Sequence, residues 1–111
     1  MNRKLAGTLG AIATTAAVLV LTPAAAHAAS DCATLGDPSG GSAQVCKSWT
    51  PDGGGSFNGT WSVGVTTSLT YVQKSEDGRV SNASGSGRYT HVKKFHLRAC
   101  SATTNRCSDW W

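Results

Sequence analysis

Two cysteines near the end of the chain, Cys100 and Cys107, constrain the fold more than any other feature of the sequence. The residues on either side of them alternate between apolar and polar types, which is typical of β-strands. Residues 101–106 between them are of the small and polar kinds found in turns. A disulfide across so short a turn stabilises a hairpin by about 2–3 kcal/mol. The sequence therefore predicts a disulfide-closed antiparallel hairpin over Lys93 to Trp111.

The same pair of cysteines predicts a register for the hairpin. If they face each other, the flanking residues pair one to one across the two strands. The predicted pairs are Ala99 with Ser108, Arg98 with Asp109, Leu97 with Trp110 and His96 with Trp111. Because side chains alternate between faces, Trp110 then shares an apolar face with Leu97, and Arg98 meets Asp109 as an opposite charge on the other face. This register leaves Trp111 exposed.

The start of the chain has the order of a secretory signal peptide. A basic head, Met1-Asn2-Arg3-Lys4, precedes an apolar run over residues 11–21, and small residues around Ala28 provide a cleavage site. A membrane anchor is the alternative, but the apolar run is well short of the roughly 20 residues that cross a bilayer. We therefore expect residues 1–28 to be a signal peptide and residues 29–111 to be one small extracellular domain.

All four cysteines of the chain lie in that domain. Small secreted domains have little core and are commonly stabilised by disulfides, so two disulfides are the favoured interpretation. Three pairings are possible, and we favour Cys32 with Cys46 and Cys100 with Cys107, since each pair encloses a turn-rich segment. A zinc site made of all four cysteines is the alternative, and the lack of a Cys-x-x-Cys pair argues against it. We expect no metal and no cofactor.

The rest of the domain alternates between strand and turn patterns, without a helical period. We expect strands over residues 43–49, 57–65, 69–76 and 79–81, and a long extended run over 88–100 with a bulge or bend near 92–94. Residues 30–42 are expected to be a loop, 51–55 a turn and 84–87 a flexible connector. Asp77-Gly78 predicts a tight hairpin. The predicted fold is a small, disulfide-stapled, all-β antiparallel sandwich of about five to seven strands.

One part of the chain resembles a known fold family. The run Phe95-His96-Leu97-Arg98-Ala99-Cys100, a turn, and Cys107-Ser108-Asp109-Trp110 resembles the last hairpin of a fibronectin type III or immunoglobulin-like sandwich. The domain departs from that pattern because it is short for seven full strands, and the buried Trp and inter-sheet disulfide of antibody domains have no clear counterpart. The hairpin, together with the Ala-rich signal, also resembles small secreted actinobacterial proteins of unassigned activity.

A basic stretch near the end of the chain is the candidate binding site. It holds Arg88, Lys93, Lys94 and Arg98 without an acid among them, and the predicted exposure of Trp111 adds an aromatic surface beside it. The alternative is that these residues form a solvent-exposed strand face whose charges keep a sheet edge from pairing with another chain. The net charge of +4 falls to +2 when Arg3 and Lys4 leave with the signal. This ordinary charge favours neither nucleic acid nor membrane as a partner.

Few residues of the domain could carry out catalysis. His91 and His96 are five positions apart and face opposite ways on a regular strand, so they form a pair only if the strand is irregular. With Glu76 and Arg88 they could form a small acid–base site, but two partly exposed strand histidines are the favoured interpretation. No Gly-x-Ser-x-Gly elbow precedes a helix. We expect no catalytic residue.

Three function hypotheses remain. The first is a secreted, non-enzymatic domain that binds a protein or an extracellular polymer. The second is an inhibitor of an extracellular hydrolase, because size and two disulfides are similar to the tendamistat family of amylase inhibitors. The cysteine spacings differ from that family, and its Trp-Arg-Tyr triplet is absent. The third, a small secreted hydrolase that uses His91 or His96, is the least favoured.

Overall fold

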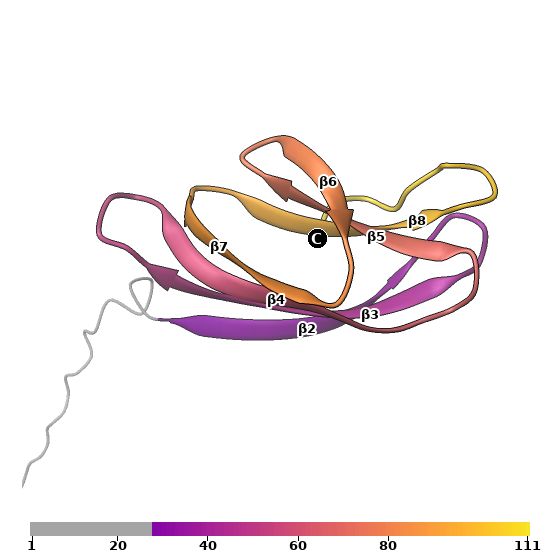
Figure 1. The fold of residues 1–111 in the computed structure, drawn as a ribbon, viewed down its shortest axis with the longest axis horizontal. Helices are drawn as coiled ribbons and strands as arrows, with labels where there is room; N and C mark the ends of the chain where they lie inside the picture. The colour runs from indigo at the N-terminus through magenta and orange to yellow at the C-terminus, as the bar shows by residue number, and fades with distance from the viewer. Residues whose placement is uncertain (1–27) are drawn as a thin grey trace, which may run out of the picture.

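In the computed structural model, which describes residues 28–111, the chain forms seven strands in two antiparallel sheets (Figure 1). The predicted signal peptide, apart from Ala28, lies outside the described residues. One sheet has the order β2-β3-β4-β7 and the other β6-β5-β8. The strands are β2 (Ala29–Gly36), β3 (Ser42–Pro51), β4 (Phe57–Thr66), β5 (Thr70–Glu76), β6 (Arg79–Ala83), β7 (Ser86–Val92) and β8 (Phe95–Ser101). The prediction of an all-β antiparallel sandwich is confirmed.

Both predicted disulfides are present. Cys32 is joined to Cys46, and Cys100 is joined to Cys107. The first bond links neighbouring strands of the four-stranded sheet, and the second links β8 to the C-terminal segment. Neither bond joins one sheet to the other. The contact between the sheets therefore depends on core packing and hydrogen bonds.

The core lies between the two sheets. Val45 of β3, Val72 of β5 and Leu97 of β8 are each at most 1 % exposed. Burying an aliphatic side chain of this size stabilises the fold by about 1.5–3 kcal/mol. Because side chains of a strand alternate between faces, the face of β3 that holds Val45 also holds Lys47 and Trp49. One charged side chain is thus placed on the inner face of the sandwich.

The first strand is a correction to the prediction of a loop over residues 30–42. Residues 29–36 form β2, which pairs with β3 in unbroken register from Ala29 opposite Trp49 to Gly36 opposite Ser42. Only the following residues, from Asp37 to Gly41, form the turn. A strand at the edge of a sheet can be polar and exposed, as β2 is, because main-chain pairing and the disulfide hold it in place.

The chain passes from one sheet to the other at Lys93 and Lys94, where β7 ends and β8 begins. Asp77 fixes this crossover, because its carboxylate accepts hydrogen bonds from the main-chain N–H of Lys93 at 3.0 Å and of Lys94 at 2.7 Å. In return the N–H of Asp77 donates to the Lys94 carbonyl at 2.9 Å. The expected interruption near residues 92–94 is present, but it separates two strands of different sheets and does not bend one continuous strand over residues 88–100. The Asp77-Gly78 hairpin, in which both residues have positive φ, is confirmed.

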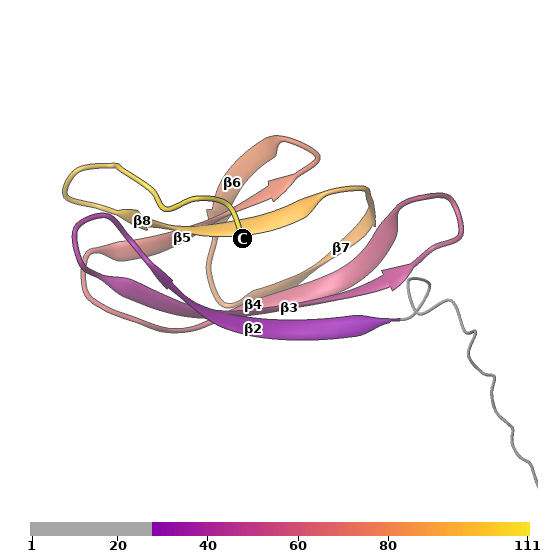
Figure 2. The same cartoon turned by 180° about the vertical axis from the view of Figure 1, so that it is seen from behind.

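The C-terminal segment returns along β8 as predicted (Figure 2), but its register differs from the prediction. Cys100 bridges Cys107, and Leu97 then exchanges main-chain hydrogen bonds of 3.1 and 2.8 Å with Trp111 rather than facing Trp110. Two residues, Asp109 and Trp110, therefore lie opposite one. Such a bulge turns every later side chain to the other face, so the predicted pairs of Leu97 with Trp110 and of His96 with Trp111 are wrong.

This change of register also alters the surroundings of three side chains. Trp111, predicted to be exposed, is partly buried and packs against the core. Trp110 instead lies over the guanidinium group of Arg98, with 4.1 Å between that group and the ring centroid. Arg98 donates two hydrogen bonds, of 3.1 and 2.7 Å, to the side-chain oxygen of Gln73. The predicted contact of Arg98 with Asp109 is therefore wrong.

Glycines on β4 and β7 make room for aromatic rings on the inner face. Gly59 is paired with Tyr89, and Gly87 with Trp61. A Cβ atom on Gly59 would lie 1.9 Å from the carbonyl oxygen of Ser48, and one on Gly87 would lie 2.6 Å from the Trp61 ring. The two rings therefore lie against glycines of the neighbouring strand. This arrangement forms the part of the interior next to the candidate site.

Candidate functional site

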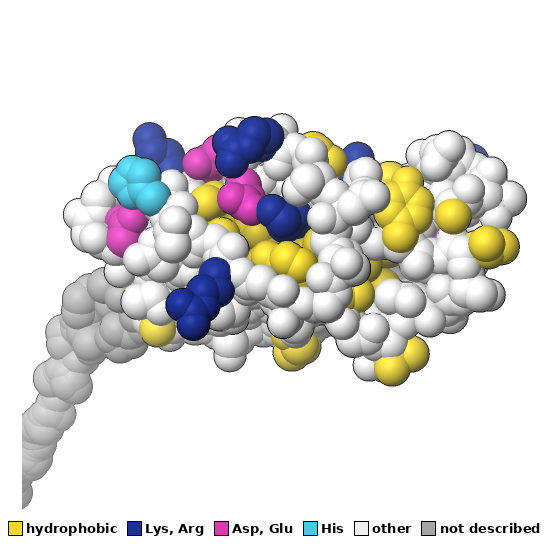
Figure 3. All heavy atoms as spheres, in the orientation of Figure 1, with side chains coloured by type: hydrophobic (Ala, Val, Ile, Leu, Met, Phe, Trp, Pro, Cys, Tyr) yellow, Lys and Arg dark blue, Asp and Glu magenta, His cyan; other side chains and the backbone are white. Residues whose placement is uncertain are grey.

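The edges of the sandwich are not fully closed by side chains. On the face drawn in Figure 3, apolar side chains are visible between the two layers, with cationic and acidic side chains around them. At the end of the sandwich where β7 passes to β8, a cavity of about 250 Å³ lies between the sheets. It is lined by Lys47, Trp49, Phe57, Tyr89, Val92, Lys93, Lys94, Phe95 and His96. We call it the crossover cavity.

Aromatic side chains make most of the apolar wall of the crossover cavity. The rings of Tyr89 and Phe95 stack with centroids 4.2 Å apart and planes 6° from parallel, which joins the two sheets. The Tyr89 hydroxyl donates a hydrogen bond of 2.6 Å to the Ser48 carbonyl, and burial raises the pKa of this phenol. Trp49 and Phe57 complete the wall from β3 and β4. The wall is therefore rigid and suited to an apolar or aromatic group.

Lys47 is held beside this wall by the C-terminal segment. Its Nζ atom donates to the main-chain oxygen of Trp111 at 2.9 Å and lies 4.2 Å from the centroid of the Trp111 ring. Burial lowers the pKa of Lys47, and the charge of Asp31 opposes that shift. A lysine that is partly removed from water is a better partner for an anion than a fully solvated one, because less water must be displaced.

His96 lies at the mouth of the cavity among the lysines. Burial lowers its pKa from the ordinary 6.5, and the charges of Lys47 and Lys94 lower it further. The imidazole is therefore mostly neutral at pH 7. Cationic side chains from β3 and from the crossover line the same cavity as His96, which gives the mouth a positive potential.

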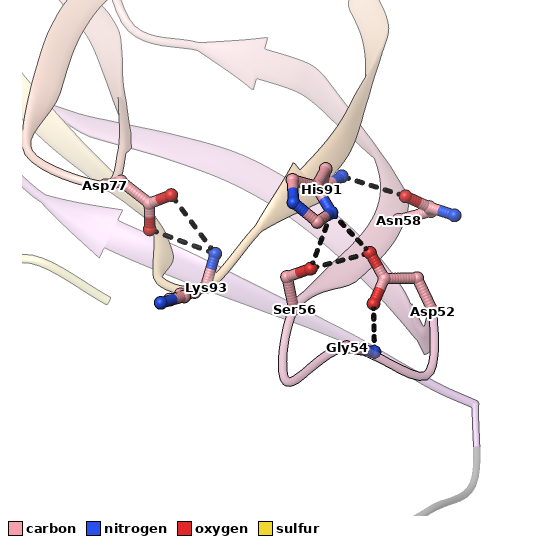
Figure 4. Close-up of polar contacts among 7 residues, drawn as sticks. All are labelled: Asp52, Gly54, Ser56, Asn58, Asp77, His91 and Lys93. Atoms are coloured by element: carbon pink, nitrogen blue, oxygen red, sulfur yellow. Dashed lines mark hydrogen bonds and ion pairs between the residues drawn. The ribbon is translucent and has the colours of Figure 1, made fainter.

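Two acids lie near the cavity without lining it. Asp77 is hydrogen-bonded to the crossover, as Figure 4 shows for Lys93. The main-chain bond from Lys94 is the largest cause of its lowered pKa, followed by the Lys93 main-chain bond and the charges of Lys93 and Arg79. Asp31 acts on Lys47 from β2. Since neither carboxylate belongs to the cavity wall, the wall itself carries lysines and a histidine but no acid.

The five residues predicted as a binding patch are divided by the fold. Lys93 and Lys94 lie together at the crossover cavity. Arg88 lies opposite Thr60 on the outer face of the four-stranded sheet, next to serine and threonine side chains and the Cys32–Cys46 disulfide. Arg98 is held by Gln73 and Trp110 in the other sheet, and Trp111 packs inward against the core and Lys47. The structure therefore brings two of the five together.

His91 forms a separate polar cluster at the turn between β3 and β4 (Figure 4). Its Nδ1 atom lies 2.9 Å from a carboxylate oxygen of Asp52 and 3.0 Å from the Ser56 hydroxyl, which donates to the same carboxylate oxygen at 2.6 Å. The Ser56 bond is the largest cause of the lowered pKa of Asp52, followed by the Gly54 N–H and the His91 bond. The alternative considered from the sequence, an acid–base site of His91 with His96, Glu76 and Arg88, is not formed around His91.

The order of contacts in this cluster differs from a hydrolytic triad. In a triad, one ring nitrogen faces the serine and the other faces the acid. Here a single nitrogen of His91 faces both Ser56 and Asp52, and Ser56 is only 2 % exposed. The hydroxyl is thus committed to Asp52. Together with the Asn58 side chain, which accepts the His91 N–H at 2.9 Å, the cluster holds His91 at a φ of 57° and fixes the turn.

No family model matches this chain, and comparison with curated proteins and with solved structures gave no match. Within residues 28–111, no group of three or more histidine, cysteine, aspartate or glutamate side chains is arranged to hold a metal ion. The same part of the chain contains no helix long and apolar enough to cross a membrane. The chemistry of the site therefore has to be inferred from the cavity itself.

Of the residues that line the cavity, only Lys93 and Lys94 were predicted as binding residues, and some of the others lie far from them in the sequence. Lys47, Trp49 and Phe57 come from strands far from the basic stretch and reach it only through sheet pairing. One signal was available, because the alternation of residues 43–49 places Lys47 on the same face as Ala43 and Val45. A charged residue on an apolar strand face requires a partner or a solvent opening. In this fold it has both, in Trp111 and the cavity mouth.

Proposed function

We propose that this chain is a non-enzymatic extracellular binding domain whose partner, a protein or an extracellular polymer, presents anionic groups to the crossover cavity. One observation carries the proposal. The cavity wall combines four aromatic side chains with Lys47, Lys93, Lys94 and His96, and contains no acid. A concave, mostly apolar surface with a few convergent polar groups is the usual form of a binding site.

Electrostatics favours an external anion at this mouth. Like charges held close together repel, and the charges of Lys47 and Lys94 add to burial, the larger cause, in lowering the pKa of His96. The ammonium groups of Lys93 and Lys94 form no ion pair with an acid of the described chain, since the two ion pairs found in residues 28–111 join Lys74 to Glu76 and His91 to Asp52. A bound anion would relieve the repulsion. It would therefore be attracted more strongly than by isolated surface lysines.

The extracellular location is part of this proposal. It rests on the signal-like sequence of residues 1–28, and two disulfides in so small a domain fit an oxidising compartment. Two relationships are proposed on the same terms: one to small secreted actinobacterial proteins of unassigned activity, and one of the C-terminal hairpin to fibronectin type III or immunoglobulin-like sandwiches. The second is supported by the sequence of the last hairpin and by the two antiparallel sheets.

A second candidate, an inhibitor of an extracellular hydrolase, is favoured by one feature. Inhibitors present a rigid protruding loop, and the loop over residues 101–106 is closed by the Cys100–Cys107 disulfide. Inside it, the Ser101 N–H donates to the Arg106 carbonyl at 2.9 Å, and the Asn105 N–H donates to the Ser101 carbonyl at 2.8 Å. Both ends of the loop are therefore held together by the disulfide and by main-chain hydrogen bonds.

The proposal is tested by capture on the immobilised, oxidised domain from the secretome and the isolated cell wall of the producing organism. Lys93→Ala/Lys94→Ala is expected to abolish saturable capture, because it removes two of the three ammonium groups at the cavity. Arg88→Ala/Arg106→Ala removes equal charge outside the cavity and should leave capture unchanged. Equal capture by both double variants would refute a role for the cavity. If the captured protein is a hydrolase that the domain inhibits, the second candidate replaces the first.

A further inference from the structure

We propose that the crossover cavity takes one aromatic ring that carries a carboxylate a few bonds away, as in a free aromatic acid or the last residue of a polypeptide that ends in phenylalanine or tyrosine. This inference rests on the proposed binding function and names the chemistry of its ligand. Three features of the cavity lead to it: its size, its stacked aromatic wall, and the lysine residues that line it together with that wall.

The size of the cavity limits what can enter it. Sites for whole drug-sized molecules span roughly 300–1,000 Å³. The crossover cavity, with about 250 Å³, is below that range and has room for one ring with its short side chain. A polymer chain or a folded surface could not enter as a whole. A partner of either kind would therefore insert a single group.

The wall favours an aromatic ring as the inserted group. Trp49, Phe57, Tyr89 and Phe95 all line the cavity, and the Tyr89–Phe95 stack is fixed by its contact across the sheets and by the hydroxyl bond to Ser48. Aromatic pairs contribute about 0.5–1.5 kcal/mol beyond the burial of their area. A rigid wall of this kind needs no rearrangement to accept a ring. Part of the usual entropy loss of binding is therefore avoided.

The ammonium groups favour a carboxylate close to that ring. Asp77 fixes the main chain of Lys93 and Lys94 at the crossover, so these side chains start from a defined place at the mouth. Lys47 is fixed on the other side by Trp111. A ring alone would leave Lys93 and Lys94 without an anionic partner, and an anion alone would leave the aromatic wall empty. Only a group with both parts satisfies both surfaces.

Four small probes separate the two parts of the ligand. They are N-acetylphenylalanine, N-acetylphenylalanine amide, N-acetylalanine and N-acetylalanine amide, titrated into the full oxidised domain and followed by amide chemical shifts. We expect only N-acetylphenylalanine to bind, with a Kd of about 1 mM for so small a ligand. Shifts should concentrate at Trp49 and residues 92–96. Equal affinity for the acid and its amide, or no binding of the acid at 10-fold that concentration, would overturn the inference.

Two further arms test the site and the source of the ligand. Lys93→Gln/Lys94→Gln should weaken N-acetylphenylalanine binding by roughly three- to tenfold, whereas Arg88→Gln/Arg106→Gln should not change it. A short peptide that ends in phenylalanine will bind more tightly than 3-phenylpropionate if the source is a polypeptide end, and equally if it is a free acid. If N-acetylphenylalanine does not bind but a partner is still captured through Lys93 and Lys94, this inference alone is refuted. Loss of both binding and capture would refute the proposed function.

Discussion

Leu69 has two unfavourable features at one position. Its φ is 64°, in the left-handed region that branched and bulky side chains avoid, and 67 % of its surface is exposed. The backbone there is held by neighbours, because the Leu69 carbonyl accepts a hydrogen bond of 2.7 Å from the Ala102 N–H. The left-handed conformation raises the free energy of the native state by about 1–2 kcal/mol for a side chain with a Cβ atom. Leu69 is therefore strained and contributes little burial.

We predict that Leu69→Gly raises the stability of the domain. Glycine adopts a positive φ without strain, and this gain exceeds the roughly 0.5–1 kcal/mol of backbone entropy that glycine loses on folding. A net gain of up to about 1 kcal/mol corresponds to a rise of about 4–8 °C in Tm. Thermal unfolding followed by circular dichroism measures it.

Val65→Gly is the matched control for this prediction. Val65 is as exposed as Leu69, at 69 %, but it lies within β4 and is not among the described residues with positive φ. In a strand, glycine loses more backbone entropy on folding than valine does, and at this position no strain is relieved in return. This variant should therefore lower Tm. Opposite signs for the two glycine variants are expected. A fall in Tm for both would show that Leu69 is not strained.

At the scale of elements, β4 and β7 depend on glycines that admit aromatic rings. We predict that Gly59→Ala destabilises the domain by about 1–3 kcal/mol, the usual effect of overpacking. The added Cβ atom would lie 1.9 Å from the Ser48 carbonyl oxygen and 2.5 Å from the Tyr89 hydroxyl, so it would also break the bond between these two groups. Chemical denaturation measures the loss.

Gly64→Ala, on the same strand, is the control for the glycine prediction. The nearest atom to its added Cβ would be the Gln44 carbonyl oxygen at 3.5 Å, an ordinary contact. This variant should retain or slightly raise the stability, because alanine loses less backbone entropy than glycine. Similar losses at both positions would mean that the ring of Tyr89 does not require Gly59. The wall of the crossover cavity would then be less fixed than argued above.

The elements that sequence alone predicts are those with a strong local signal. Asp77-Gly78 specifies its turn chemically, and the turn-rich segments between the cysteines favoured the pairing that the structure has. The pairing of β2 depends instead on a partner strand, since its small and polar residues are also common in loops. The bulge opposite Arg98 inserts one residue without any composition signal, and it reverses the predicted exposure of Trp111. Local chemistry was predictable, whereas long-range register was not.

In the candidate site too, local features were predictable from the sequence and long-range contacts were not. Lys93 and Lys94 are adjacent in sequence, and the predicted bend between strands located them correctly at a break. Their grouping with Lys47 and Trp49 requires knowledge of which strand lies in which sheet. Alternation along a strand gives the face but not the sheet. A cavity between two sheets therefore cannot be predicted from the sequence until the sheet topology is known.

At the scale of the whole molecule, three aspartates fasten turns to distant segments. The Asp37 carboxylate accepts a hydrogen bond of 2.7 Å from the Thr70 hydroxyl, which connects the β2–β3 turn to β5 in the other sheet. Asp52 connects the β3–β4 turn to His91 on β7, and Asp77 connects the β5–β6 turn to the crossover. Since no disulfide joins the two sheets, the Asp37 and Asp77 contacts supplement the core in holding them together, whereas the Asp52 contact acts within the four-stranded sheet.

These three carboxylates predict that the domain loses stability in acid. Hydrogen bonds lower the pKa of each below the ordinary 3.8, with Thr70 the largest cause for Asp37, Ser56 for Asp52 and the Lys94 main chain for Asp77. The unfolded chain then binds protons more readily than the native one. The contribution to stability is complete above about pH 5 and is lost progressively as the pH falls through 4 toward the folded-state pKa values. Melting temperatures between pH 2 and 7 measure this loss.

Asp37→Asn isolates one of the three contacts. The amide oxygen of asparagine can still accept the bonds from the N–H groups of Ser39 and Gly41, at 2.6 and 3.1 Å. The amide nitrogen, which replaces the other carboxylate oxygen, cannot accept the bond from the Thr70 hydroxyl. This variant should be less stable than the native chain at pH 7 and should lose less on acidification. Asp109→Asn is the control, because the Asp109 carboxylate accepts no hydrogen bond from residues 28–111. Its Tm should change with pH as that of the native chain does. An unchanged acid dependence in Asp37→Asn would show that the fastening of the turns does not control acid stability.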